Sequence, residues 1–484
     1  MGYKLRRVAA LAAVLVAVPS AVSAVPIPGL PGPLLVPSYV GAPATAQPIA
    51  SFPVPQNPFL APNGRSNMHN DAYGTNAYSW SGPLGRKPVV TSALYGVDEC
   101  ATLAFDSGGR IVGLCGELSG PVLRLINPST LGVIAGMGLP GRKADPTVNP
   151  LSDLCGGTYF YLDQSNRVVV ATTNRHIEVV ADTGHSFVLQ HTYDLSSVVP
   201  SDDCLIALMP DWSGHVWFET GNGIVGELDP GPGIARTVQL AGEIIDNSFS
   251  VDETGGVYVV SDHAMYRFGL NDSGAPVITW RSPYDRGSVQ KPGQLAQGSG
   301  TTPTLFGSNY VGITDNADPQ MHVNVYDRST GQFVCSAPVF APGASDTENS
   351  MVGVGNSLFV ENNYGYQGPQ STALGKTTSP GIARVDVAGG ACSVAWTSQQ
   401  IAPTSVPKAS LANGLLYVYT KPAALLEDAW YLTALDLRTG RTVFSKLAGT
   451  GPQYNNHYAA IYIGPNHSAY IATLTGMVRV HDSF

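Results

Sequence analysis

The feature that most constrains this chain is a repeat of about 45–50 residues that runs from about residue 90 to the C-terminus. Each unit carries a tight turn rich in Asp, Asn, Ser and Gly, followed by a short apolar run such as HVWFET, GVYVVSD or LLYVYT. Such turn residues between short runs of β-branched and aromatic residues are typical of β-hairpins. The turns of this first series lie at residues 106–109, 163–166, 211–214, 252–256, 307–309, 355–356, 412–414 and 464–467.

A second series of turns recurs with the same period, for example at residues 327–331 and 436–440. Asp accepts local backbone hydrogen bonds and Gly supplies positive φ, so we interpret most of these aspartates as structural. Two hairpins in each unit give four strands, and this period is that of a β-propeller blade rather than of a helical solenoid. We therefore predict an all-β chain that forms a β-propeller of about eight four-stranded blades, with seven blades as the alternative.

The last unit, from Tyr454 to the end of the chain, holds only three strands. A missing fourth strand would leave an unpaired edge. Residues 87–92, which precede the first unit, are the natural source of that strand. The N- and C-terminal strands are therefore expected to close the ring together.

The chain before the repeats divides into three parts. Residues 1–24 combine a basic start, an apolar run and Val22-Ser23-Ala24, the pattern of a cleavable signal peptide, so we expect a secreted, extracellular or cell-envelope protein. Residues 25–62 form a proline-rich arm, residues 63–86 an N-terminal extension, and residues 87–484 the propeller domain. No segment after residue 24 is apolar and long enough to span a bilayer.

The six cysteines form an even set, which favours disulfides in an oxidising compartment. Cys100 and Cys115 flank the first hairpin at positions that oppose each other across its strands, within disulfide reach. Cys155 and Cys204 both begin the first strands of consecutive units. Cys335 and Cys392 both lie in the fourth strands of consecutive units. We predict these three pairs.

The net charge and the absence of several catalytic motifs limit the kinds of ligand and partner that this chain is expected to bind. Only 13% of the residues are charged and the net charge is −9, which argues against a nucleic-acid partner. The chain has no nucleophile elbow, phosphate loop, dinucleotide fingerprint or His-Glu-x-x-His motif in a supporting context. A small molecule or a cation remains the expected ligand, and the proline-rich arm is a candidate surface for a protein partner.

Polar residues recur where the first strand of each unit begins and the second strand ends. In a propeller these positions surround one mouth of the central channel, and here they are mainly acidic. The set includes Asp98, Glu99, Asp202, Asp203, Glu219, Asp262, His263, Lys408 and Asn456.

Within this mouth, Glu348, Asn349, Glu361, Asp246 and Asn247 form our candidate site for a divalent cation such as calcium, because carboxylate and amide oxygens suit that ion. His457 is the candidate proton carrier. Tyr364 and Tyr366 offer aromatic surface for a sugar or a quinone ring. His69 belongs to the extension, which either folds over the mouth or packs on the rim.

The segment ALDLRTGR at residues 434–441, and more loosely VYDRSTGQ at residues 325–332, resembles the Ala-x-Asp-x-x-Thr-Gly turn of quinoprotein alcohol dehydrogenase-like propellers, the PQQ-like family. The resemblance covers most of residues 90–484 and implies the propeller fold. Where that family has a Trp after the Gly, this chain has Phe444 and Cys335, and a vicinal Cys-Cys pair is absent. These departures argue against pyrroloquinoline quinone as a cofactor without excluding it.

Three functions follow from these observations. The favoured one is an exported propeller that binds a small molecule or divalent cation at its acidic mouth. The second is an enzyme that uses the same mouth, either a metal-dependent lactonase-like hydrolase or a quinone-dependent oxidoreductase. The third is a cell-envelope scaffold for protein–protein interaction.

Overall fold

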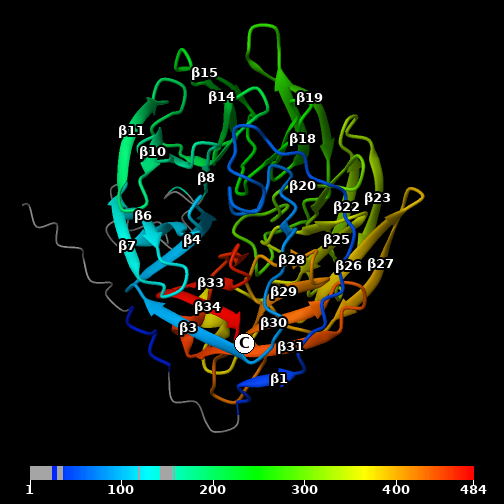
Figure 1. The fold of residues 1–484 in the computed structure, drawn as a ribbon. Coiled ribbons are helices and arrows are strands. Elements are labelled where there is room, and N and C mark those ends of the chain that lie inside the picture. The colour runs from blue at the N-terminus through cyan, green and yellow to red at the C-terminus, as the bar shows by residue number, and fades with distance from the viewer. Residues whose placement is uncertain (1–23, 30–35, 118–119, 142–154, 156–158, 484) are drawn as a thin grey trace, which may run out of the picture.

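The computed structural model describes residues 24–29, 36–117, 120–141, 155 and 159–483. Within these ranges the chain is almost entirely β-structure, with short 3-10 helices at Pro369–Thr372 and Pro452–Tyr454. Eight sheets stand around a central axis and form an eight-bladed β-propeller (Figure 1). No helix in the described ranges is long and apolar enough to cross a bilayer. The predicted fold class and the blade number of eight are confirmed.

The first four blades follow the chain from the innermost to the outermost strand. Blade 1 contains β4 (Asp98–Phe105), β5 (Ile111–Glu117), β6 (Gly120–Ile126) and β7 (Val133–Gly138). Blade 2 contains β8 (Phe160–Leu162), β9 (Arg167–Ala171), β10 (His176–Asp182) and β11 (Phe187–Asp194). Blade 3 contains β12 (Leu205–Pro210), β13 (Val216–Thr220), β14 (Ile224–Asp229) and β15 (Ile234–Gln239). Blade 4 contains β16 (Ser250–Val251), β17 (Val257–Val260), β18 (Ala264–Leu270) and β19 (Pro276–Pro283).

The last four blades continue this order. Blade 5 contains β20 (Thr304–Phe306), β21 (Tyr310–Thr314), β22 (His322–Asp327) and β23 (Phe333–Pro338). Blade 6 contains β24 (Val352–Val354), β25 (Ser357–Glu361), β26 (Ile382–Ala388) and β27 (Ala391–Ser398). Blade 7 contains β28 (Lys408–Ser410), β29 (Leu415–Thr420), β30 (Ala429–Asp436) and β31 (Thr442–Thr450), with β1 (Tyr39–Gly41) at its outer edge and β2 (Ala77–Tyr78) at its inner edge. Blade 8 contains β32 (Ile461–Ile463), β33 (Ala469–Thr473), β34 (Gly476–Asp482) and β3 (Pro88–Leu94).

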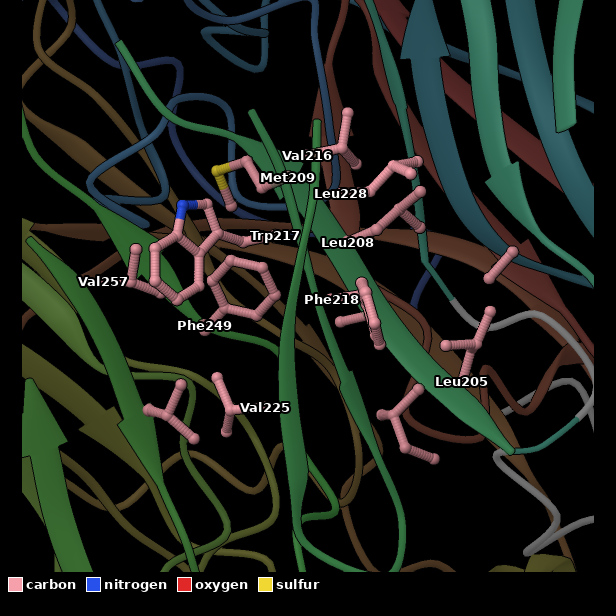
Figure 2. Packing of buried hydrophobic residues seen from close by; sticks show 14 of the residues in the cluster. Leu205, Leu208, Met209, Val216, Trp217, Phe218, Val225, Leu228, Phe249 and Val257 are labelled. Atoms are coloured by element: carbon pink, nitrogen blue, oxygen red, sulfur yellow. The ribbon is translucent and has the colours of Figure 1, made fainter. Parts of the chain in front are cut away.

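The hydrophobic core lies between neighbouring blades. Trp217 and Phe218 are consecutive residues of β13 and point to opposite faces of blade 3, as the period of two along a strand requires (Figure 2). Trp217 lies toward Phe249 and Val257 of blade 4 (Figure 2). Every residue of β13 is buried, whereas the outermost strand β11 is mostly exposed. Inner strands are therefore apolar on both faces because both faces are covered.

The ring closes as predicted. Strand β3 pairs antiparallel with β34, from Pro88 opposite Asp482 to Leu94 opposite Gly476. A strand from the start of the repeat region thus completes the sheet made by the last three strands of the chain. This pairing ties the two ends of the propeller together.

The turns that carry the family resemblance hold adjacent blades together. Gly440 of blade 7 lies directly against the ring of Trp396 of blade 6, whose Nε1 donates to the Leu437 carbonyl at 3.2 Å. Gly331 of blade 5 lies in the same way against Trp280 of blade 4. These glycines have φ of +69° and +72°, and a Cβ at either position would meet the indole ring. The turns therefore have a structural role.

Residues 57–80, which we call the central segment, lie in the channel along the innermost strands. Sequence reasoning left their place undecided between the mouth and the rim. Instead they contact the innermost strand of every blade. The hydrogen bonds, of 2.7–3.0 Å, run from Phe105 N to Arg65 O, Leu162 N to Ser66 O, Asn57 Nδ2 to Pro210 O, Val251 N to Ala72 O, Leu305 N to Tyr73 O, Gly353 N to Thr75 O, Ala409 N to Asn76 O and Trp80 Nε1 to Ile463 O.

Residues 39–49 of the proline-rich arm follow blade 7. Its strand β1 pairs antiparallel with β31, from Tyr39 opposite Lys446 to Gly41 opposite Phe444. Further along, Gln47 N donates to Asn413 O and Ile49 N to Leu411 O, at the end of the ring opposite the mouth. The arm therefore leads the chain to that opposite end, where the central segment enters the channel.

All three predicted disulfides are present. Cys100 and Cys115 are opposed on β4 and β5 within blade 1. Cys155 and Cys204 join the segments before the innermost strands of blades 2 and 3. Cys335 of β23 and Cys392 of β27 join the outermost strands of blades 5 and 6.

We expect stepwise losses of stability in three truncated chains that start at residues 57, 82 and 96. The first loses only the arm, the second also loses the central segment, and the third also loses β3. Because a net protein hydrogen bond contributes about 0.5–1.5 kcal/mol, loss of the central segment should cost roughly 4–12 kcal/mol. Thermal unfolding measures this order. Equal melting temperatures for the chains starting at 57 and 82 would contradict the structural role of the central segment.

The disulfide between blades 5 and 6 should stabilise more than the one within blade 1. The two bridges span 57 and 15 residues. Chain-entropy arguments then give about 4 and about 3 kcal/mol. We expect C335S/C392S to unfold at lower denaturant concentration than C100S/C115S, and both below wild type. A C335S/C392S protein as stable as wild type would refute this expectation.

Candidate functional site

The mouth of the channel is formed where the innermost strands begin and the second strands end. Of the predicted cation ligands, Asn349 and Glu361 lie together on blade 6, and Asn349 Nδ2 donates to Glu361 Oε1 at 2.5 Å. The other carboxylate oxygen of Glu361 is buried without a hydrogen-bond partner among the described residues. Burial raises the pKa of Glu361 well above its ordinary value.

Asp246 and Glu348 come from different blades and line the same small cavity. Its free volume is about 10 Å³, room for about one water molecule or a bare ion. Ser299 and Gln297 supply further oxygen atoms to its wall. In the described ranges no Lys or Arg pairs with either carboxylate, although Glu348 Oε2 accepts a hydrogen bond from Leu295 N at 2.9 Å. This cavity is the core of the candidate site.

Two further carboxylates stand beside this cavity. Both carboxylate oxygens of Glu219 and of Asp346 are buried without hydrogen-bond partners among the described residues. Burial raises the pKa values of Glu219 and Glu348; the charge of Asp246 adds to the shift of both groups, and the charge of Asp346 adds to that of Glu348. Sequence analysis placed Glu219 at the mouth but not in the site, and it missed Asp346. The available signal was spacing, since Asp346 precedes Glu348 by two residues.

Burial controls the protonation of this group. Burial, followed by the charge of Asp262, raises the pKa of Asp246 to about 6. Burial also raises the pKa values of Glu219, Glu348 and Asp346 well above their ordinary values. Desolvated carboxyl groups hold protons more tightly than free carboxyls do, and only for Asp346 does a nearby cation, Lys291, oppose the effect. The same arrangement favours a bound cation once they are ionised.

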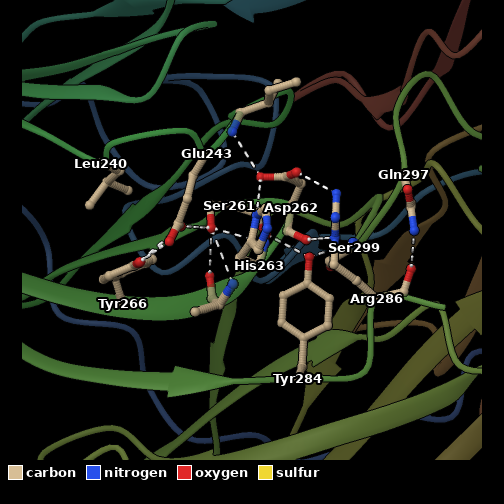
Figure 3. Close-up of polar contacts among 12 residues, drawn as sticks. Leu240, Glu243, Ser261, Asp262, His263, Tyr266, Tyr284, Arg286, Gln297 and Ser299 are labelled. Atoms are coloured by element: carbon tan, nitrogen blue, oxygen red, sulfur yellow. Dashed lines mark hydrogen bonds and ion pairs between the residues drawn. The ribbon is translucent and has the colours of Figure 1, made fainter. Parts of the chain in front are cut away.

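Asp262 lines the same cavity but is already neutralised. Its carboxylate accepts from Arg286 at 2.6 Å, from His263 Nδ1 at 2.8 Å and from Ile244 N at 2.8 Å (Figure 3). Arg286 Nε also donates to the Asp262 carbonyl. Both Asp262 and His263, which sequence analysis placed at the mouth, therefore serve structural contacts.

Residues 284–300 form a roof over the mouth. This loop joins β19 of blade 4 to β20 of blade 5 and reaches blades 5, 6 and 8 through bonds from Lys291 Nζ to Ala317 O, Gly365 N to Pro292 O and Tyr458 Oη to Gly293 O. Asn247, one of the predicted ligands, donates from Nδ2 to Ser299 O and so holds the roof. A Cβ at Gly293 would meet Asp346 Oδ1 at 2.4 Å, so the loop approaches that carboxylate as closely as only glycine allows.

The central segment forms the floor. His69 Nε2 lies 3.3 Å from Thr302 Oγ1, and the His69 ring lies 6.1 Å from that of Tyr159. Lys408 is fully buried and donates to Met68 O and Asn76 Oδ1. Burial lowers the pKa of Lys408 well below its ordinary value and that of His69 to about 3. The floor therefore supplies little positive charge to the carboxylates above it.

His457 and Tyr366, the predicted proton carrier and ring platform, contact each other. Tyr366 Oη lies 2.9 Å from His457 Nδ1 and 3.1 Å from Asn455 Oδ1. The ring of Tyr366 also meets that of Tyr458 edge-on at 5.2 Å. Tyr366 is only 1% exposed, so it offers no open face to a ligand. Tyr364 N donates instead to Asn362 Oδ1 at 3.1 Å.

A group of Asp98, Cys100 and Cys115 has ligand atoms close enough to hold a metal ion. The two sulfurs are bonded to each other, and Asp98 pairs with Arg124 at 2.5 Å. A disulfide is not a thiolate, the form in which cysteine binds metals. We therefore do not assign this group as a metal site.

The cavities at the roof and beside His69 do not fit pyrroloquinoline quinone, a fused three-ring molecule. The central segment fills the channel, and the cavities beside the roof and beside His69 have free volumes of about 10 Å³ each. Tyr366 is covered by its own neighbours. No part of the mechanism is therefore assigned to a quinone.

Comparisons with known proteins agree with the fold. No family model matches the chain. An uncharacterized protein of Archaeoglobus fulgidus is 26% identical over 390 residues, covering 72% of this chain and 75% of that protein. Among solved structures, quinohemoprotein alcohol dehydrogenase from Comamonas testosteroni has a TM-score of 0.57 at 11% identity, covering 88% of this chain and 81% of its own. A europium-containing methanol dehydrogenase has a TM-score of 0.54 at 10% identity, covering 85% and 97%. The chain thus shares the propeller fold of quinoprotein methanol and alcohol dehydrogenases, and the likeness is one of fold alone.

Proposed function

We propose that this propeller is an exported protein that binds a divalent cation, with calcium as the first choice, in the cavity between Asp246 and Glu348. The observation that carries the proposal is the pairing of two carboxylates from different blades in an ion-sized cavity without a Lys or Arg partner among the described residues. Glu219 adds a third carboxylate whose oxygens are buried and unpaired. The site binds its ion without an assigned reaction.

The donor set favours a hard cation. Carboxylates and the oxygens of Ser299 and Gln297 are the ligand types of calcium and magnesium, whereas zinc prefers nitrogen and sulfur. Buried carboxylates repel one another, and a divalent ion removes that repulsion. A solved structure of similar fold is described as europium-containing, which is compatible with a hard cation but does not locate one here.

The enzymatic alternatives have less support. A lactonase-like hydrolase needs a base that can reach the bound ion, and the candidate His457 is engaged with Tyr366. A quinone-dependent oxidoreductase needs room for a three-ring cofactor, whereas the cavities at the roof and beside His69 have free volumes of only about 10 Å³ each. The scaffold alternative rests on the arm, whose described part packs against blade 7. The three disulfides support export, because disulfides form and persist in oxidising compartments.

Calcium should raise the melting temperature of the wild-type protein and EDTA should reverse the effect. An ion present at about 100 times its dissociation constant stabilises by about 2.7 kcal/mol. The D246N/E348Q variant keeps side-chain volume but removes two charges, so its melting temperature should not respond. D272N, which removes an exposed charge in a turn between β18 and β19, should respond like wild type. A calcium response that survives in D246N/E348Q would disprove the site.

The calcium response should grow with pH. Because folding raises these carboxyl pKa values, the contribution of these groups to the stability of the ion-free protein is fully present below the unfolded value of about 4. The protein loses that contribution as pH rises through the folded values, about 6 for Asp246. Ionised carboxylates bind calcium, so the shift in melting temperature should be small at about pH 5 and larger at about pH 8. A shift that is constant across this range would contradict the participation of these groups.

A further inference from the structure

Six large hydrophobic side chains are more exposed than any others of their kind in the described part of the chain. Their exposed fractions range from 59% to 88%, and all six are Val or Leu. Exposed hydrophobic residues scattered over a surface are ordinary, but these all lie at one end of the propeller. They are Val25, Val97, Val289, Leu374, Leu425 and Leu426.

All six lie at the mouth end of the propeller. Val97 directly precedes β4, and Leu374 lies between β25 and β26 of blade 6. Leu425 and Leu426 lie between β29 and β30 of blade 7, and Val289 lies in the roof. Val25 reaches the same end, since its carbonyl accepts from Leu94 N, the last residue of β3. We call this set the aliphatic rim.

Two loops of the rim are built to hold their leucines outward. The Asp428 carboxylate accepts from Leu374 N at 3.1 Å and from Gly375 N at 2.8 Å, and it pairs with buried Lys421 at 3.2 Å. Ala424 N donates to Gly375 O, which joins the two loops. Leu374 and Leu426 have φ of +56° and +59°, an unfavourable region for leucine. The loops therefore present these side chains in a fixed arrangement.

The shape of the rim distinguishes between partners. Its residues belong to loops of blades 1, 6 and 7 and to the roof between blades 4 and 5, so they surround the mouth rather than fill one patch (Figure 1). A flat apolar layer such as a bilayer can contact all of these separated loops at once. A protein partner usually binds one compact interface rich in aromatic and Arg contacts. Residues 422–426, PAALL, carry no charged side chain.

The chain outside the described residues points the same way. The apolar run at residues 8–24 belongs to the predicted signal peptide, and Val25, the first residue after it, lies at the mouth end. Until that leader is cleaved, it keeps the mouth end of the chain next to the bilayer through which the chain is exported.

We propose that the aliphatic rim docks this protein on the surface of a lipid bilayer, with Leu374, Leu425 and Leu426 inserted at the level of the headgroups. The net charge of −9 excludes general attraction to anionic lipid as the driving force. Apolar insertion is the driving force, since each buried CH₂ group favours the membrane. The mouth of the channel then faces the bilayer.

Flotation with vesicles of pure phosphatidylcholine tests the proposal. The protein is recovered after export and its N-terminus is determined by mass spectrometry, so that all variants share it. Wild type should float with the vesicles, and L374S/L425S/L426S should lose at least about tenfold in partition coefficient. L425D should lose binding similarly, and this residue is 88% exposed, so its substitution leaves the fold intact.

The matched control is V188S/L189S/I234S, which removes three exposed hydrophobic side chains from β11 and β15. It should bind as wild type does, and phosphatidylglycerol added to the vesicles should not strengthen binding. Wild-type protein that stays in solution, or leucine variants that float like wild type, would overturn the proposal. So would a dimer that L425D dissociates in the absence of lipid, because the rim would then be a surface between two copies of the chain.

Discussion

The structure depends on hydrogen-bond partners for the backbone groups at the inner edges of its eight innermost strands. The outermost strand of each blade can direct its free backbone groups to water. The innermost strand directs its free backbone groups into the channel. Buried backbone groups must be paired, and no repeat unit can supply a partner on the axis. The central segment supplies it, because residues 57–80 bond in turn to all eight blades. The channel is therefore filled by the chain itself.

This filling determines the chemistry of the mouth. The floor carries Lys408 and His69, but burial disfavours the charged form of both. At the roof, Arg286 pairs with Asp262 and Lys291 lies near Asp318. Asp246, Glu219 and Glu348 are left without cationic partners among the described residues, in a cavity too small for an organic ligand. A compact ion is the ligand that such an environment accommodates best.

Periodic features of the sequence predicted the periodic parts of the structure. The spacing of the turns predicted the eight blades. The missing fourth strand of the last unit predicted the pairing of β3 with β34, and the register of the first hairpin predicted the disulfide between Cys100 and Cys115. The central segment has no period, since its contacts follow the axis rather than a strand pattern, and its place was not predictable. Asp246 and Glu348, which sequence analysis grouped, line one cavity, and their role as cation ligands stays a prediction. Residues that depend on loop paths, such as Arg286 and Asp346, were missed.

The position of the central segment also sets an order of events during synthesis. Its residues leave the ribosome among the first, yet Trp80 bonds to Ile463 in the last blade, and β3 waits for β34. None of these contacts exists until nearly the whole chain has been made. Trp80 and β3 therefore stay without these partners while the later blades emerge, although Arg65 and Ser66 can already contact blades 1 and 2. Closure of the ring is thus a late step that the first part of the chain has to wait for.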